Sequence, residues 1–121
     1  MNGLAVIITT PDPVRFRAGL TLALAQSALG GRVRVYCHEA SVALLASAPR
    51  DDDDCAALAS AGLPDRQGLI AMALASGITL IACQTGLAMS GLSIEALVPG
   101  VEAGGMMGLL ADLGDDRLVT I

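Results

Sequence analysis

The stretch Ile78-Thr-Leu-Ile-Ala-Cys83-Gln-Thr-Gly86 decides the fold of this chain. It begins as a short apolar, β-branched run, which is typical of a buried strand, and it ends in a small polar turn. The residues after it, 87–92, are typical of the first turns of a helix. Ligands in parallel α/β proteins bind at the carboxyl ends of the strands, so we expect Cys83 at the rim of such a crevice.

Two interpretations of Cys83 stay open from its position. A helix that starts directly after the thiol directs backbone N–H groups and its dipole at the sulfur, which favours the thiolate. A cysteine is also a small hydrophobic residue, and many buried cysteines only fill space. The position therefore indicates either a reactive thiol or a core residue.

Strands and helices alternate along the rest of the chain. Strands are predicted at 3–9, 32–37, 78–83 and 117–121, with a short extended piece at 98–101. Helices are predicted at 13–29, 42–48, 55–60, 66–76, 86–91 and 102–113. The side chains expected to cap helices are Asp12, Ser41, Asp54 and Asp65. This order predicts a single domain over residues 1–121, a three-layer α/β/α sandwich with a mainly parallel sheet of about four to five strands.

Three predicted strands end in residues that can carry chemistry. If these strands are parallel, their carboxyl ends meet at one rim, together with two thiols, Cys83 and Cys37, and the single histidine. The candidate binding residues at this rim are Thr9, Thr10, His38, Gln84, Thr85 and Gly86.

The remaining cysteines are weaker candidates. Alternation puts Cys37 on the apolar face of its strand, so we expect a core residue. Cys55 follows the acidic run Asp51–Asp54, whose carboxylates raise the pKa of a thiol, so we expect it to be inert. The acidic run lacks the spaced ligands and the central glycine of a Ca²⁺ loop, and we expect a solvated, mobile loop. Only three thiol and imidazole ligands gather at the rim, so we predict no metal site.

Composition restricts the class of protein. The chain has 121 residues, 54% hydrophobic and 2% aromatic, and so much aliphatic surface in so small a chain predicts a homo-oligomer. The net charge is −5 without a single lysine, which argues against a nucleic-acid partner. Three cysteines without a CxxC pair, and no secretory signal, indicate reduced thiols in a cytoplasmic protein. No phosphate-loop, dinucleotide or HExxH motif occurs, so we expect no cofactor.

The segment 67–94 carries no charged residue and is long enough to span a bilayer. Glycines interrupt it at four positions, and it lacks the aromatic and basic flanks of a membrane helix. We therefore expect a helix, a buried strand and a second helix, and no membrane partner.

Several stretches, spread over nearly the whole chain, occur in a familiar order and spacing. They are the opening strand 3–9, the long first helix, Ile-Ala-Cys83 with its polar turn and Met89, Glu95-Ala-Leu-Val-Pro-Gly-Val101, Gly104-Gly105 and the closing Asp-Arg-Leu-Val strand. In these stretches the chain resembles the DsrE/DsrF-like proteins, which include TusD-related sulfur-relay subunits and small single-domain homologues labelled peroxiredoxin-like. The resemblance implies a small DsrE/DsrF-like α/β domain that assembles into trimers or hexamers. In the sulfur-relay members, the cysteine that matches Cys83 carries a persulfide.

Three hypotheses about function follow. The first is a sulfur carrier, similar to a sulfurtransferase, that holds sulfane sulfur on Cys83 and passes it from a donor protein to an acceptor protein. The second is a non-catalytic, oligomeric module that binds a small ligand at the rim. The third is a thiol-redox protein in which Cys37 resolves an oxidised Cys83.

Overall fold

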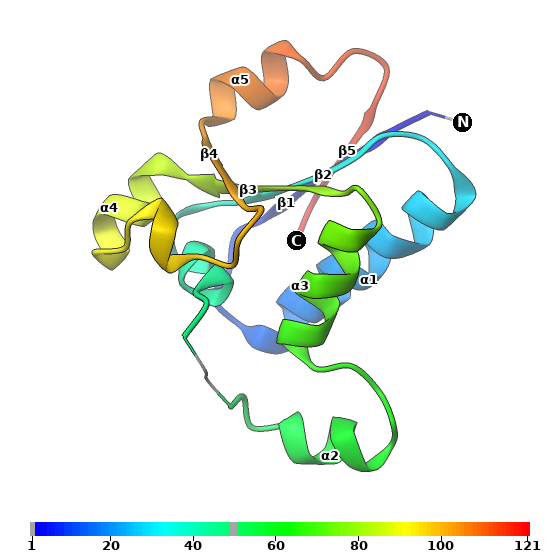
Figure 1. Cartoon of the computed structure of the whole chain (residues 1–121). Coiled ribbons are helices and arrows are strands. Elements are labelled where there is room, and N and C mark those ends of the chain that lie inside the picture. Colours follow the sequence, from blue (N-terminus) through cyan, green and yellow to red (C-terminus); the bar gives the residue numbers. More distant parts are fainter. Residues whose placement is uncertain (1, 49–50) are drawn as a thin grey trace.

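The computed structural model describes residues 2–48 and 51–121, which form one five-stranded sheet with helices on both sides (Figure 1). The strands follow the order β4-β3-β2-β1-β5, and every neighbouring pair is parallel. The elements are β1 (Leu4–Ile8), α1 (Pro13–Leu29), β2 (Val33–Cys37), η1 (Glu39–Leu45), α2 (Cys55–Ser60), α3 (Arg66–Ala75), β3 (Thr79–Cys83), α4 (Gln84–Ser90), η2 (Ile94–Ala96), β4 (Glu102–Gly104), α5 (Met106–Ala111) and β5 (Arg117–Thr120). The predicted α/β class with a parallel sheet is confirmed.

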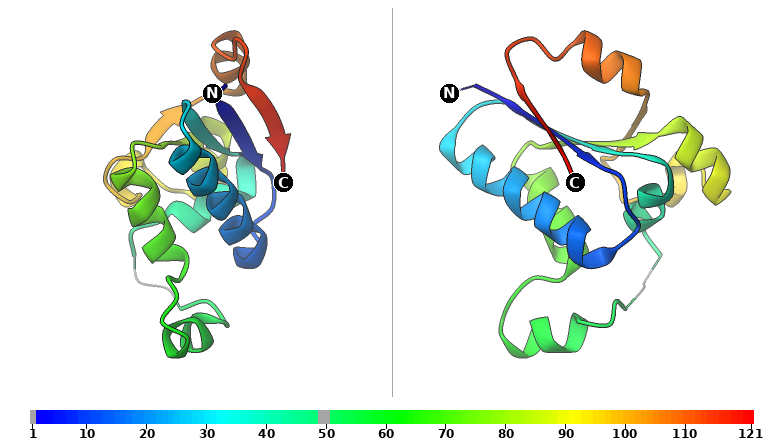
Figure 2. Two further views of the ribbon diagram at one scale, coloured as in Figure 1. Left: turned by 90° about the vertical axis from the view of Figure 1, so that its right-hand side faces the viewer. Right: turned by 180° about the vertical axis from the view of Figure 1, so that it is seen from behind.

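The two faces of the sheet are covered unequally. Val6, Val35 and the other residues of their alternation set pack under α1 and α3, which lie side by side on one face (Figure 2). The opposite face carries Tyr36 and its register partner Ile81, and the short helix α5 lies over part of it through Leu109. This second face also carries Cys83, because Cys83 lies two residues after Ile81 on the same strand.

Two helix starts match the sequence prediction in detail. Asp12 caps α1, and its Oδ1 accepts a hydrogen bond of 2.9 Å from the backbone N–H of Val14. Asp65 caps α3 in the same way through Gly68, also at 2.9 Å. These carboxylates satisfy N–H groups that have no partner inside the helix, and so they fix where each helix begins.

The helix predicted at 42–48 is wrong. The chain instead forms the 3₁₀ helix η1, which begins three residues earlier, at Glu39. Ser41 does not cap it, because its hydroxyl lies 2.9 Å from the carbonyl oxygens of both Ile8 and His38. This buried hydroxyl hydrogen-bonds to the carbonyl groups at the end of the sheet, and so it holds η1 against the rim of the sheet.

The single helix predicted at 102–113 is also wrong, as is the extended piece at 98–101. Residues Glu102–Gly104 form strand β4, and only Met106–Ala111 are helical. A Cβ at Gly104 would lie 2.8 Å from Ile81 Cγ2, so glycine lets this edge strand come close to β3. Hydrogen bonds to β3 therefore outweigh the local helical pattern.

The acidic run is partly engaged with the protein, which corrects the prediction of a solvated loop. Arg66 Nε donates to Asp52 Oδ2 at 2.8 Å, and both side chains are almost fully buried. Asp54 pairs with Arg17 of α1 and makes no capping hydrogen bond to α2. Two arginines therefore fix this loop to α1 and α3.

The charge-free segment 67–94 is divided among α3, β3 and α4, as expected. Within residues 2–48 and 51–121, no helix combines the length and the apolar character needed to cross a membrane.

Candidate functional site

Cys83 is the last residue of β3 and the N-cap residue of α4. Its backbone is extended, with φ −61° and ψ 131°, so the chain turns from strand to helix without a connecting loop. The backbone N–H groups of Thr85 and Gly86, in the first turn of α4, hydrogen-bond to the thiol. The thiol thus lies between a strand and a helix, as predicted.

Gly86 allows a second segment to approach this thiol. A Cβ at Gly86 would lie 2.5 Å from the carbonyl oxygen of Glu39 and 2.5 Å from Val42 Cγ2. No real Cβ comes so close to backbone, so a larger residue would push η1 away from α4. Glycine at this position therefore lets η1 rest on the first turn of α4.

Glu39, the first residue of η1, adds another backbone donor. Its φ is +45°, in the left-handed region that non-glycine residues adopt at a cost of about 1–3 kcal/mol. Its N–H group hydrogen-bonds to Cys83. The backbone conformation that places this N–H at the sulfur is thus one that the surrounding structure must maintain.

Tyr36 provides the side-chain donor. It lies on β2, opposite Ile81 of β3, and its hydroxyl hydrogen-bonds to Cys83. Burial raises the pKa of Tyr36, and its hydrogen bond to Cys83 and the charge there raise it further. The phenol therefore stays protonated and remains a donor to the sulfur.

These donors decide the ionisation of the thiol. Burial alone would raise the pKa of Cys83, which is only 5% exposed. Hydrogen bonds from Glu39, Tyr36, Gly86 and Thr85 together outweigh burial and lower the pKa below the ordinary value of 9.0. Three elements, η1, β2 and α4, thus stabilise one thiolate.

The other two thiols have the opposite shift. Cys37 is fully buried, and burial raises its pKa to about 12, an effect that the neighbouring Ser41 hydroxyl only partly offsets. Burial, with the carboxylates of Asp65 and Asp51, raises the pKa of Cys55. Cys83 alone among the three cysteines has a lowered pKa.

Cys37 and Cys83 do not face each other. Cys37 pairs in register with Ala82, so its side chain points to the face covered by α1 and α3, whereas Cys83 points to the other face. The sheet lies between the two sulfur atoms, and a disulfide needs Cβ atoms about 3.5–4.5 Å apart with converging directions. This geometry argues against Cys37 as a resolving thiol.

The other predicted rim residues are placed as follows. His38 is half-exposed on the same face as Tyr36, with its ring centre 6.4 Å from the tyrosine ring and Nε2 3.6 Å from a carboxylate oxygen of Glu39. Thr9 and Thr10 follow β1, where their hydroxyls bond to Ile121 O and the backbone N–H of Asp12.

The structure brings some of these residues together and separates others. Strand β2 lies between β1 and β3, so the threonines are a strand away from Cys83. The side chains of Gln84 and Thr85 are exposed, and it is the backbone of Thr85 and Gly86 that contacts the thiol.

Sequence reasoning missed Tyr36 and Glu39. Strict alternation carried a signal for the tyrosine: it points away from the face of Val35 and Cys37 and towards the face of Cys83. Glu39 gave no such signal, because its role depends on a backbone angle. In the described part of the chain, no group of three or more His, Cys, Asp or Glu side chains is arranged to hold a metal ion.

Comparison with known proteins supports the fold. No protein-family model matches the sequence, and no curated protein matches it. MTH1491 from Methanobacterium thermoautotrophicum, a protein of unknown function, has a similar structure with a TM-score of 0.75 and 17% identity over 100% of both chains. The ychN protein from E. coli has a TM-score of 0.74 and 17% identity, again over 100% of both chains.

A third solved structure is BT1422 from Bacteroides thetaiotaomicron, a conserved protein of unknown function. Its TM-score is 0.63 and its identity is 23%, over 98% of this chain and 94% of that chain. These structures share the α/β fold with this chain. At such low identity they support the fold and no particular activity.

Proposed function

We propose that this chain is a sulfane-sulfur carrier that holds a persulfide on Cys83. The observation that supports this proposal is the convergence of donors on one thiol: three backbone N–H groups and the Tyr36 hydroxyl outweigh burial and lower its pKa. A thiolate is the form of cysteine that attacks sulfur, and a lowered pKa increases its share at neutral pH.

The proposed transfer needs no oxidant or reductant. The Cys83 thiolate attacks the outer sulfur of a donor persulfide, the bond between the donor's two sulfurs breaks, and the donor thiolate leaves with the electron pair. Cys83 then carries the sulfur as a persulfide. An acceptor thiolate attacks that outer sulfur in turn, and the Cys83 thiolate is the leaving group.

The same hydrogen bonds serve both half-reactions. Donors that stabilise the thiolate increase its share at neutral pH before loading, and they make Cys83 a better leaving group when the sulfur is passed on. Because Glu39, Thr85 and Gly86 donate from the backbone, side-chain replacement at those positions does not remove their N–H groups. Tyr36 is the donor that a conservative mutation can test.

Access limits which donors can reach the thiol. Cys83 is 5% exposed, so a donor must present its persulfide on a narrow group, such as a small thiol or an extended protein segment. We further propose that the sulfur comes from a donor protein and passes to an acceptor protein, each of which reaches Cys83 with such a narrow group. We also propose that the chain assembles into a homo-oligomer.

Loading with a persulfide tests the proposal. The protein is incubated with glutathione persulfide, and intact and peptide masses are recorded. We expect a gain of one sulfur atom on Cys83, absent in Cys83→Ser and retained in the matched control Cys37→Ser. An unmodified Cys83 would favour the ligand-binding hypothesis, and a disulfide between Cys37 and Cys83 would favour the redox hypothesis.

A further inference from the structure

Ser41 is a buried polar residue at the point where η1 meets the sheet. It is 0% exposed, and its hydroxyl oxygen lies 2.9 Å from the carbonyl oxygen of Ile8 and 2.9 Å from that of His38. Ile8 is the last residue of β1, so its carbonyl belongs to the sheet, whereas His38 is the residue that precedes η1. The Ser41 hydroxyl therefore ties the start of η1 to the end of the sheet.

The His38 carbonyl is one half of a peptide unit whose other half is the N–H of Glu39. A trans peptide unit is planar, and its C=O and N–H groups point in opposite directions. Every peptide bond that the structure describes is trans, so a contact that holds the His38 C=O also directs the Glu39 N–H. That N–H is the group of η1 that hydrogen-bonds to Cys83. The serine and the thiol thus engage opposite ends of one peptide unit.

The backbone at Glu39 shows why this peptide unit must be held. Its φ of +45° lies in the left-handed region, which is unfavourable for a residue with a side chain. A flip of the His38–Glu39 peptide unit would return φ to a negative value and relieve this strain. The same flip would turn the Glu39 N–H away from Cys83. The relaxed backbone and the hydrogen bond to the thiol therefore exclude each other.

Two groups of Ser41 oppose the flip. Its hydroxyl contacts the His38 carbonyl oxygen, and its backbone N–H donates to the same oxygen at 3.2 Å. The Ile8 carbonyl also has a backbone donor, the His38 N–H at 2.9 Å. Each carbonyl thus keeps one hydrogen bond when the hydroxyl is removed, so a variant without it buries no unpaired carbonyl. Such a variant should fold, and its change should lie in the orientation of the peptide unit.

We propose that Ser41 is a positioning residue for Cys83, whose hydroxyl keeps the His38–Glu39 peptide unit in the orientation that directs the Glu39 N–H at the sulfur. Ser41 acts on the thiol through this N–H. By holding it in place, Ser41 favours the thiolate that attacks a donor persulfide and that later leaves. The role in sulfur transfer rests on the proposed function, whereas the effect on the ionisation of the thiol does not.

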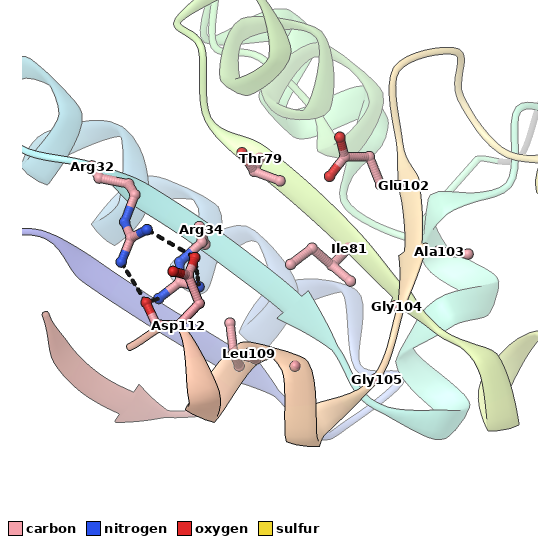
Figure 3. Close-up of a pocket in the computed structure, with 11 residues that line it drawn as sticks. Arg32, Arg34, Thr79, Ile81, Glu102, Ala103, Gly104, Gly105, Leu109 and Asp112 are labelled. Atoms are coloured by element: carbon pink, nitrogen blue, oxygen red, sulfur yellow. Dashed lines mark hydrogen bonds and ion pairs between the residues drawn. The ribbon is translucent and has the colours of Figure 1, made fainter. Parts of the chain in front are cut away.

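The ionisable groups around the thiol are the same in the parent and in a Ser41 variant. Those on the elements packed against it come from β2 and from the start of η1; they are Tyr36, His38 and Glu39. Apart from the thiol itself, β3 and α4 carry none. A cavity of about 390 Å³ lies on the same sheet face, under α5, and its charged lining residues are Arg32, Arg34, Glu102 and Asp112 (Figure 3). A difference between the two pH profiles therefore reports the orientation of the donors to Cys83.

The first test is the pH profile of alkylation. Labelling of Cys83 by iodoacetamide is followed by peptide mass spectrometry in the parent, Ser41→Ala and Ser47→Ala. Ser47 is the matched control, because its hydroxyl and its N–H also donate to a single carbonyl, that of Ala96, at 3.0 and 2.9 Å. We expect Ser41→Ala to react severalfold more slowly at neutral pH, with its profile shifted to higher pH, and Ser47→Ala to match the parent. A Ser41→Ala profile equal to that of the parent would overturn the proposal.

The second test observes the backbone amide of Glu39 by NMR. In the parent, part of the pH-dependent chemical shift of this amide should follow the ionisation of Cys83, and that part should disappear in Cys83→Ser. It should shrink in Ser41→Ala and stay unchanged in Ser47→Ala. If the Glu39 amide in the parent is insensitive to Cys83, the proposal is wrong, whether or not Ser41→Ala folds.

Loading with glutathione persulfide separates this proposal from the sulfur-carrier function. If the parent gains no sulfur, the carrier function fails, while the alkylation profile and the Glu39 amide still decide the role of Ser41. If the parent gains sulfur but the alkylation profiles of parent and Ser41→Ala coincide, the carrier function stands and the positioning role is wrong. If both proposals are right, Ser41→Ala gains sulfur severalfold more slowly than the parent at neutral pH.

Discussion

At Cys83, burial and hydrogen bonding act on the same thiol in opposite directions. A fully desolvated thiol holds its proton, as Cys37 does on the other face of the sheet. Cys83 is buried almost as well, yet four donors stabilise its charged form and its pKa is lowered. The difference between the two residues comes from the strand end: Cys83 meets the free N–H groups of a helix start, and Cys37 meets the side chains of the core.

Tyr36→Phe tests the side-chain donor. The substitution removes one hydroxyl that hydrogen-bonds to the Cys83 sulfur, so the pKa of Cys83 should rise and alkylation by iodoacetamide at neutral pH should slow severalfold. The rate is measured against pH by mass spectrometry. At a pH where Cys83 is fully ionised in both proteins, the variant should react at least as fast as the parent, because a thiolate of higher pKa is the better nucleophile; a slower variant there would indicate changed access. An unchanged profile would mean that the hydroxyl does not act on this thiol.

Cys37 makes stability depend on alkaline pH. Its pKa is raised from 9.0 to about 12 in the folded protein, so above pH 9 the unfolded chain releases this proton while the folded chain keeps it. Stability should therefore fall between pH 9 and pH 12, by at most about 1.4 kcal/mol per pH unit from this group. Cys37→Ala should reduce the decline between pH 9 and pH 10 in urea unfolding. An equal decline in both proteins would rule out Cys37 as its source.

Among the elements, η1 and α4 form the site by touching. The close contact of their backbones at Gly86 puts the Glu39 N–H at the thiol. Two segments far apart in the sequence thus pack closely against each other, and the pKa of Cys83 depends on that packing.

Gly86→Ala tests that contact. The new Cβ would clash with the Glu39 carbonyl and with Val42, so we expect a loss of stability of about 1–3 kcal/mol and slower alkylation of Cys83. Gly108→Ala is the matched control, since its Cβ meets open space and alanine favours a helix by up to about 1 kcal/mol. Chemical denaturation measures both. A Gly86→Ala protein as stable and as reactive as the parent would show that η1 and α4 tolerate separation.

The elements also show how far sequence reasoning reaches. Strands β1, β2 and β3 and helix α1 were predictable, because local apolar patterns and the Asp12 cap decide them. Strand β4 was not, since its extended form depends on pairing with β3 at Gly104. The thiol was found from a strand end next to a helix start. The sequence did not reveal that Glu39 and Tyr36 donate to this thiol, because these contacts depend on a backbone angle and on packing across strands.

On the scale of the whole molecule, the sheet separates two environments. One face is closed by α1 and α3, and the other carries Cys83, Tyr36 and the open cavity under α5. Large apolar side chains remain exposed on the outer surfaces of the helices and on β5; they include Val14, Leu22, Leu29, Met72, Met107, Leu110 and Leu118.

We predict a homo-oligomer, a trimer or a dimer of trimers, that buries part of this surface. Apolar burial contributes about 25 cal/mol per Å², so a few hundred Å² per subunit outweighs several surface ion pairs. Because salt screens charge pairs and leaves apolar burial in place, the assembly should persist in high salt. Light scattering coupled to size exclusion measures the mass. A uniform 12.2 kDa particle at micromolar concentration in both low and high salt would contradict the prediction.

The most direct test of the central claim is the ionisation of Cys83 itself. Thiolate absorbance is titrated in the parent protein and in Cys83→Ser, and the difference between the two curves belongs to Cys83. The hydrogen bonds from η1, β2 and α4 predict a midpoint below 9.0, the ordinary value of a thiol. A midpoint at or above 9.0 would mean that burial outweighs the hydrogen bonds to Cys83. This cysteine would then be a core residue and no sulfur carrier.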